Sequence, residues 1–262
     1  MSREEMPGMF WLWVIHIVLG TGLLTPWNSY LTSMDFWTFI FDDRISDAFA
    51  IANFIPNFLL LVVQLRFLQG NLVPKAVFGL VSYVVVISFA VWLIVVVKVH
   101  EVEWKAQQPY YAAAMIGSVG LAGGACAILQ GALYSFSGQL PPSLVGGLMT
   151  GSALAGVLCC VCRVISKLVF EKLEPEEALR WSSLVYMSSS LFVVAAALLC
   201  LFLLVRHPIV KHHMAQTSGS HQHSSPPPIN EDEETASSTD DLVAHPQPHL
   251  RAGHERGQGE GR

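Results

Sequence analysis

Six long apolar runs constrain this chain more than any other feature. They cover residues 9–31, 47–67, 74–97, 110–136, 144–170 and 181–205, and each approaches the roughly 20 residues that a helix needs to cross a bilayer. Composition agrees, because 13% of the residues are charged, against about 25% in soluble domains. We therefore expect an all-α, polytopic membrane protein whose six transmembrane helices lie within residues 1–206.

The balance of charge changes after Arg206. Residues 1–206 hold 11 basic and 12 acidic side chains, whereas residues 207–262 hold 4 basic and 8 acidic ones together with 8 of the 10 histidines. A segment with so few large apolar residues cannot bury enough surface to offset the entropy lost on ordering. We expect residues 207–262 to be a disordered, acidic tail rich in His, Pro and Ser. Its run 230–241 makes Ser237 and Ser238 candidates for phosphorylation, with a plain solvated linker as the preferred interpretation.

Cysteine positions and motif content argue against an enzyme. All five cysteines lie in or beside apolar runs, which favours small packing residues, and Cys159-Cys160-x-Cys162 lacks the spacing of a zinc site. The sequence has no phosphate-binding loop, no G-x-S-x-G and no H-E-x-x-H. We expect no catalytic residue, no cofactor, no metal site and no nucleic-acid partner. Primary active transport by this chain alone is excluded, since it has no nucleotide-binding loop.

The connections between the runs say little about orientation. The first connection carries Asp35, Asp42, Asp43 and Arg44, and acidic residues also mark the third and fifth. Basic residues divide five against five between the two sides, so the positive-inside rule does not decide the orientation. The acidic connections favour a cytoplasmic N-terminus and tail.

Uncharged polar groups lie within several of the runs. The first run places Pro26, Trp27 and Asn28 at membrane depth, and we expect Pro26 to kink its helix and free backbone carbonyls. Asn57 in the second run and Gln130 in the fourth add amides that pair with heteroatoms, while Trp27 offers a stacking face. Such a set suits a neutral, polar, ring-bearing solute. We predict Trp27, Asn28, Asn57 and Gln130 as substrate-binding residues, with interhelical hydrogen bonding as the alternative role.

The fifth run combines two cations with small residues. Arg163 and Lys167 lie four residues apart and share a helix face with Gly156. Charges within a span usually face a protein interior or an aqueous path, but these two could also extend to the headgroups or form a structural pair. Gly151 and Gly156 belong to small-xxx-small spacings that permit close helix packing.

Several of these segments resemble the signature motifs of the equilibrative nucleoside transporter family. Residues 22–30, GLLTPWNSY, resemble its G-x-L-x-P-W-N-x-[FY] motif, and residues 163–167, RVISK, are similar to its R-[IL]-x-[ST]-K motif. The other matching segments, in the same order as in the family, are 128–134 (ILQGALY), 140–142 (LPP), 149–157 (MTGSALAGV) and 207–211 (HPIVK).

The resemblance carries expectations of its own. Family members have eleven spans, a cytoplasmic N-terminus, a large inner loop after the sixth span and a fold like that of the major facilitator superfamily. The six runs then correspond to the N-terminal half, and the tail to the start of the central cytoplasmic loop. By position, Trp27 lines the central cavity, Gln130 hydrogen-bonds the nucleobase, and Gly151 and Gly156 are packing positions.

The function implied is facilitative or proton-coupled transport of nucleosides or nucleobases by alternating access. Residence in the plasma membrane is favoured over an internal membrane. The family's later spans have no counterpart in the sequence, so we expect a partial chain that does not transport alone and whose partners include lipid, substrate and a missing half or another subunit. Two alternatives stay open: an organic-cation carrier of the same family, with Asp47 as its candidate carboxylate, and a non-transporting fragment that associates through glycine-rich helices.

Overall fold

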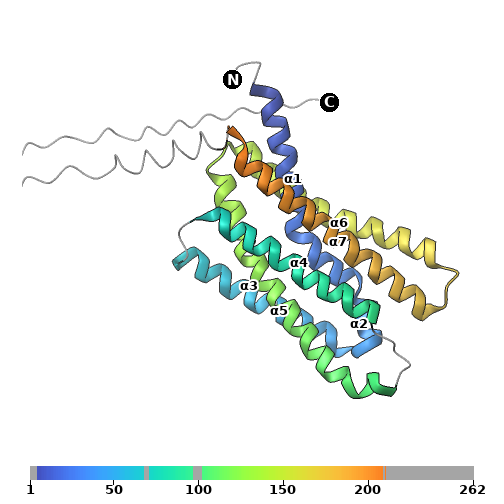
Figure 1. Ribbon diagram of the computed structural model, residues 1–262. Coiled ribbons are helices and arrows are strands. Elements are labelled where there is room, and N and C mark those ends of the chain that lie inside the picture. The colour runs from blue at the N-terminus through green and yellow to red at the C-terminus, as the bar shows by residue number, and fades with distance from the viewer. Residues whose placement is uncertain (1–4, 68–70, 97–101, 209, 211–262) are drawn as a thin grey trace, which may run out of the picture. The chain divides into compact units, whose positions relative to one another are not determined.

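The computed structural model describes residues 5–67, 71–96, 102–208 and 210, and that part of the chain is helical apart from short connections. The elements are α1 (Glu5–Thr32), α2 (Met34–Phe41), α3 (Arg44–Phe67), α4 (Leu72–Val96), α5 (Val102–Gly138), α6 (Pro142–Phe170) and α7 (Pro175–Arg206) (Figure 1). All of them except α2 are long and apolar enough to cross a membrane. The prediction of an all-α protein with six membrane-spanning helices is confirmed.

The boundaries differ from the predicted ones mainly at three places, one of which is the start of α5, at Val102 rather than residue 110. The first connection contains the helix α2, which buries Phe36, Trp37 and Ile40 and so has an apolar face that a count of its charges does not reveal. The last span begins at Pro175 rather than residue 181, because proline fits the first turn of a helix and the acidic residues that follow it favour the positive end of the helix dipole.

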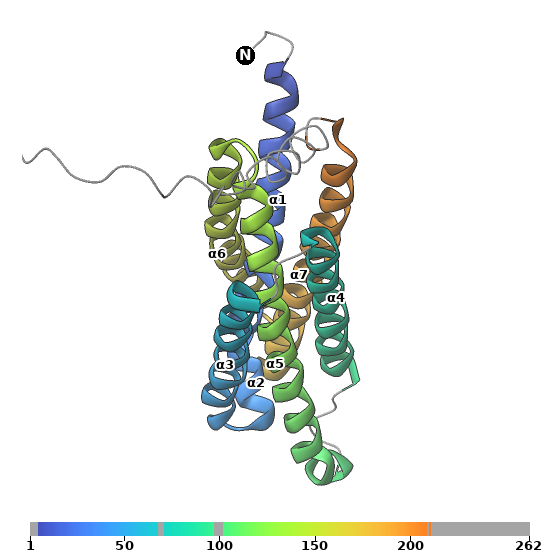
Figure 2. The same cartoon turned by 90° about the vertical axis from the view of Figure 1, so that its left-hand side faces the viewer.

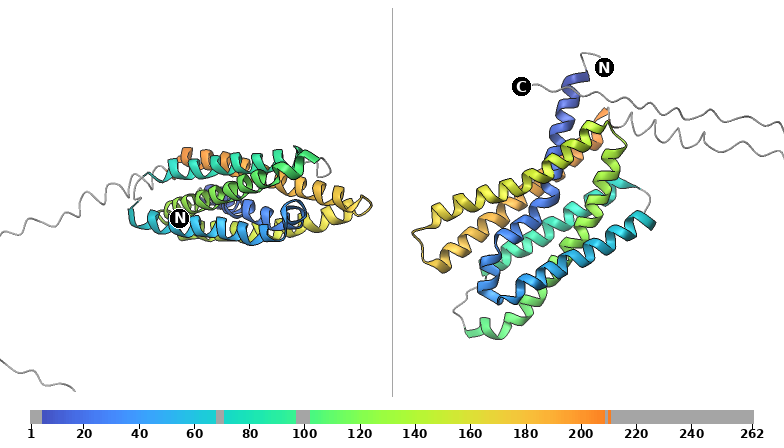
Figure 3. Two further views of the ribbon diagram at one scale, coloured as in Figure 1. Left: turned by 90° about the horizontal axis from the view of Figure 1, so that it is seen from below. Right: turned by 180° about the vertical axis from the view of Figure 1, so that it is seen from behind.

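The spans form three layers. Seen from below, α4 and α7 make one layer, α1 and α5 lie in the middle, and α3 and α6 make the third (Figure 3). The middle helices provide most of the contacts: α1 packs on α6 and α7, and α5 packs on α3 and α4. In contrast, the backbone of α3 does not approach that of α1 or α6 closely within the described ranges, and α3 meets α1 through ring contacts, Trp27 with Phe54 and Tyr30 with Phe49. The third layer is therefore divided, and α3 and α6 are the least buried spans.

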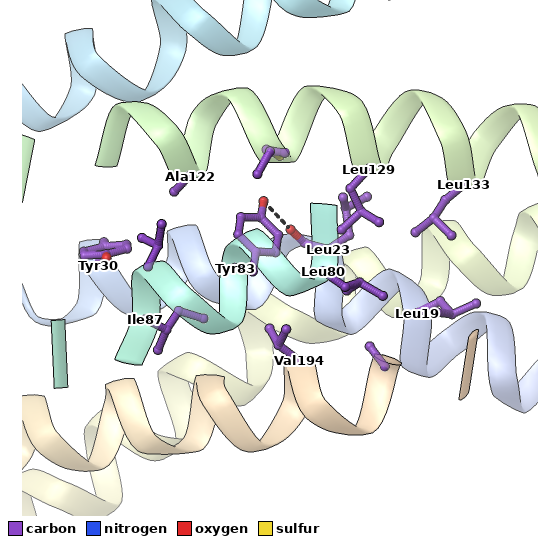
Figure 4. Close-up of a cluster of buried hydrophobic side chains, with 14 of the residues drawn as sticks. Leu19, Leu23, Tyr30, Leu80, Tyr83, Ile87, Ala122, Leu129, Leu133 and Val194 are labelled. Carbon is purple, nitrogen blue, oxygen red and sulfur yellow. Dashed lines mark hydrogen bonds between the residues drawn. The ribbon is translucent and has the colours of Figure 1, made fainter. Parts of the chain in front are cut away.

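The core lies where α1, α4, α5 and α7 meet. Leu23 of α1, Leu80 of α4, Leu129 of α5 and Val194 of α7 are almost completely buried there (Figure 4). Since lipid tails are as apolar as leucine, close packing and interhelical hydrogen bonds have to hold such helices together. The glycine contacts and the buried hydroxyl groups described below supply both.

The short helix α2 lies beside one end of α3 and α5 (Figure 2). Trp37 is completely buried, and its indole N–H donates to the Ser33 hydroxyl at 3.0 Å. The side-chain amide of Gln108 on α5 donates to the carbonyl oxygens of Ile40 and Phe41, at 2.6 and 3.2 Å. These bonds satisfy carbonyls that the end of a helix leaves without partners.

The predicted tail is described only at residues 207, 208 and 210. Its expected disorder, its acidic run and the candidate serines Ser237 and Ser238 lie outside the described residues.

Candidate functional site

The middle of α1 is held against α6 by contacts that leave no room for side chains. A Cβ atom at Gly20 would collide with the Leu148 carbonyl, and one at Gly151 would collide with the Ile17 carbonyl. The Thr21 hydroxyl, which is 2.9 Å from the Ile17 oxygen of its own helix, is also 3.1 Å from the Gly151 oxygen. Gly151 thus lies at the point of closest approach between the two helices. A Cβ at Gly156, by comparison, would meet no atom within 4 Å.

Trp27 extends from α1 in the middle layer toward α3. Its ring meets that of Phe54 edge to face, with the centroids 5.4 Å apart. Trp27 and Asn28 are both half-buried, whereas Pro26, just before them, is buried. The helix α1 runs on through Pro26 to Thr32. Tyr30 of α1 also meets Phe49 of α3 edge to face, with the centroids 6.2 Å apart, but the two backbones do not approach each other closely in the described part of the chain. The half-buried indole therefore lies on a loosely packed side of the bundle, which we call the open side.

Gln130 projects toward the same open side from α5. Gly123 marks the face of α5 that touches α3, since a Cβ there would collide with the Asn53 backbone. Gln130 lies seven residues further on and so only about 20° from Gly123 around the helix. Leu133, which is buried, points toward α1 (Figure 4) and lies about 60° to the other side of Gln130. The Gln130 side chain is half-buried and has no hydrogen bond to any other residue that the structure describes.

Asn57 is half-buried on α3, as Trp27 is on α1 and Gln130 on α5. On α4, the buried Tyr83 donates its hydroxyl to the Leu23 carbonyl of α1 at 3.2 Å (Figure 4). Sequence reasoning did not single out Tyr83. A hydroxyl-bearing ring in the middle of an otherwise apolar run was the available signal for Tyr83.

The two cations of α6 have different surroundings. Arg163 donates to the carboxylate of Asp35 on α2 at 2.9 Å, and the side chains are 39% and 53% exposed. Lys167 is exposed and borders a cavity of about 390 Å³ between the ends of α1 and α2 and the α6–α7 hairpin. Phe170, Ser182 and Tyr186 also line it. Arg163 therefore forms an ion pair, while Lys167 borders a largely apolar cavity of a size that small ligands occupy.

The predicted site residues thus fall into four places. Trp27 lies on the open side between α1 and α3, with Asn28 next to it, and Gln130 lies near the face of α5 that touches α3. Asn57 is half-buried on α3. Gly151 lies in the α1–α6 contact, and Arg163 and Lys167 lie near the α2 end of the bundle. A half-open surface with a tryptophan face and an unpaired amide can bind a planar, polar ring by stacking and hydrogen bonding.

The chain is similar to known nucleoside and nucleotide transporters. A family described as "Nucleoside transporter" matches residues 114–254. The similar curated proteins include Equilibrative nucleotide transporter 1 of Arabidopsis thaliana, 27% identical over 187 residues that make up 69% of this chain and 40% of the relative. Another is Equilibrative nucleoside transporter 4 of Homo sapiens, 29% identical over 186 residues, or 67% of this chain and 31% of the relative. Equilibrative nucleoside transporter 4 of Danio rerio is 27% identical over 163 residues, 59% of this chain and 29% of the relative. The chain spans less than half the length of these relatives.

Proposed function

This chain belongs to the nucleoside transporter family, which matches residues 114–254, more than half of the chain. We propose that it provides one part of a carrier for nucleosides or nucleobases. Transport proceeds by alternating access and is either facilitative or coupled to protons. The resemblance drawn from the sequence motifs is confirmed at the level of the family. Its family is one of transporters, and we propose that the chain catalyses no reaction.

The observation that carries this proposal is the open side on which Trp27 and Gln130 lie. Both side chains are half-buried, and the Gln130 amide has no partner among the described residues. An amide that water or a ligand can reach costs little while free and gains a bond when a nucleobase edge is presented to it. Trp27 supplies an aromatic face, and Asn28 a second amide.

The relatives are longer than this chain, and alternating-access carriers bind substrate between two halves. We propose that the open side is completed by further helices, in a longer polypeptide or in another subunit. The six-helix bundle by itself then binds lipid but does not transport. We also propose that the carrier resides in the plasma membrane with the N-terminus and the segment after α7 in the cytoplasm.

A genetic experiment tests this function with the protein as it exists. Disrupting the gene in the cells that produce this chain should lower saturable uptake of uridine or adenosine, and the intact gene should restore it. Restoration with Trp27→Ala or Gln130→Ala should leave uptake reduced at equal protein abundance. Unchanged nucleoside uptake after disruption would overturn the proposal, and loss of organic-cation uptake instead would favour a cation carrier. Asp47, the candidate carboxylate for such a carrier, is exposed in the first turn of α3.

A second arm tests the need for further helices. The 262-residue chain, expressed alone in cells without nucleoside transporters, should give no saturable uptake. Uptake of uridine by this chain alone would show that the six-helix bundle suffices.

A further inference from the structure

Tyr83 contacts α1 at the turn that precedes Trp27. Its side chain is 1% exposed, and its hydroxyl donates to the Leu23 carbonyl at 3.2 Å (Figure 4). In an α-helix that carbonyl also accepts the N–H of the residue four positions later, which here is Trp27. Tyr83 therefore binds the backbone group on which the position of Trp27 directly depends.

This turn of α1 needs support from outside its own helix. Pro26 has no N–H, so the Gly22 carbonyl lacks the helical donor that it would otherwise have. Gly22 is held from the α7 side, where a Cβ on it would collide with the Ala197 side chain. Tyr83 holds the next residue, Leu23, from the α4 side. The segment weakened by proline is thus fixed by one packing contact and one hydrogen bond.

We propose that Tyr83 is a positioning residue for nucleoside binding: its hydroxyl fixes the turn of α1 that presents Trp27. This inference rests on the proposed function, since it assumes that Trp27 contacts the substrate. Tyr83 itself touches no substrate, because it is buried between α4, α5 and α1.

The test compares two identical chemical changes at different places. Tyr83→Phe removes the hydroxyl and keeps the ring, and Tyr110→Phe does the same at a side chain that is 77% exposed. In cells with the disrupted gene, Tyr83→Phe should raise the half-saturation concentration for uridine about threefold to tenfold, as expected for one neutral hydrogen bond. The maximal rate per protein molecule should stay the same within roughly twofold, and Tyr110→Phe should behave as the unmodified protein.

Hydrogen–deuterium exchange of the purified 262-residue chain in lipid nanodiscs separates this inference from the proposed function. Tyr83→Phe should speed exchange in peptides that cover residues 23–30 and leave the other spans unchanged. Faster exchange in every span, or none beyond that of Tyr110→Phe, overturns the inference, as does local exchange without a change in half-saturation. If the intact gene restores no nucleoside uptake to the disrupted cells, the proposed function fails, and the exchange measurement alone decides whether Tyr83 holds this turn.

Discussion

Arg163 on α6 donates a hydrogen bond of 2.9 Å to the carboxylate of Asp35 in the first turn of α2. The two residues are 128 positions apart in the sequence, and the pair ties the short helix after α1 to the fifth span. Tyr186 of α7 lines the same cavity as Asp35. The charge on Arg163 thus has a protein partner at the end of the bundle where α2 lies.

Breaking this ion pair should change stability little. The side chains of Arg163 and Asp35 are 39% and 53% exposed, and exposed pairs contribute about 0–1 kcal/mol. In a double-mutant cycle of Asp35→Asn and Arg163→Gln, the coupling free energy measured by unfolding in detergent should stay below about 1 kcal/mol and fall as salt is added. A coupling above about 3 kcal/mol would mean that the pair is desolvated, contrary to its exposure.

Adding one methyl group should change the free energy of unfolding differently at two glycines of α6. At Gly151 a Cβ would collide with the Ile17 carbonyl of α1, whereas at Gly156 it would meet nothing within 4 Å. Gly151→Ala should therefore lower the free energy of unfolding by about 1–3 kcal/mol through overpacking. Gly156→Ala should leave it unchanged or raise it by up to about 1 kcal/mol, because alanine favours the helix.

Thermal unfolding of both variants in one detergent checks this contrast, with the unmodified chain as the reference. Equal losses at Gly151 and Gly156 would contradict the close approach of α1 and α6 at Gly151.

The six spans could be predicted from the sequence because length and hydropathy alone decide whether a segment can cross a bilayer. The predicted and observed ranges of the third span, 74–97 and Leu72–Val96, differ by two residues or fewer at each end. The helix α2 was missed because it is only eight residues long and lies among charged residues, which hide its apolar face of Phe36, Trp37 and Ile40.

The residue types of the candidate site could be predicted from the sequence, but the residues that they contact could not. The polar types of Trp27 and Gln130 at membrane depth identify them in the sequence. Their partners depend on which helices lie side by side, and the bond from Tyr83 to Leu23 joins residues 60 positions apart. Helix periodicity fixes the face of each residue but not the helix opposite it.

Removing the Gln108 amide should loosen α2. The amide donates to the carbonyls of Ile40 and Phe41 at the end of that helix, and Gln108→Ala leaves both without this partner. We expect a loss of about 1 kcal/mol in the free energy of unfolding, with faster deuterium exchange in residues 34–41. Gln139→Ala, at an exposed glutamine just after α5, serves as the control. If exchange in residues 34–41 is unchanged, Gln108 does not stabilise α2.

Gln130 should affect substrate affinity without affecting the fold. Its amide has no hydrogen bond to another described residue and is half-buried on the open side of α5, so Gln130→Ala removes no hydrogen bond within the bundle that the structure describes. The loss of one neutral hydrogen bond to a nucleobase should raise the half-saturation concentration for adenosine about threefold to tenfold, with the melting temperature and abundance unchanged.

The effect of Gln130→Ala should depend on which hydrogen-bonding groups the base carries, which a purely structural role of Gln130 would not predict. A purine nucleoside without an exocyclic substituent offers fewer groups for an amide to pair with. The effect of Gln130→Ala should therefore be smaller for that nucleoside than for adenosine, whereas Gln139→Ala should affect neither. Uptake measured over a range of concentrations of both nucleosides decides the matter. An equal loss for the two nucleosides, or one that follows protein abundance, would mean that Gln130 supports the helix rather than binding the base.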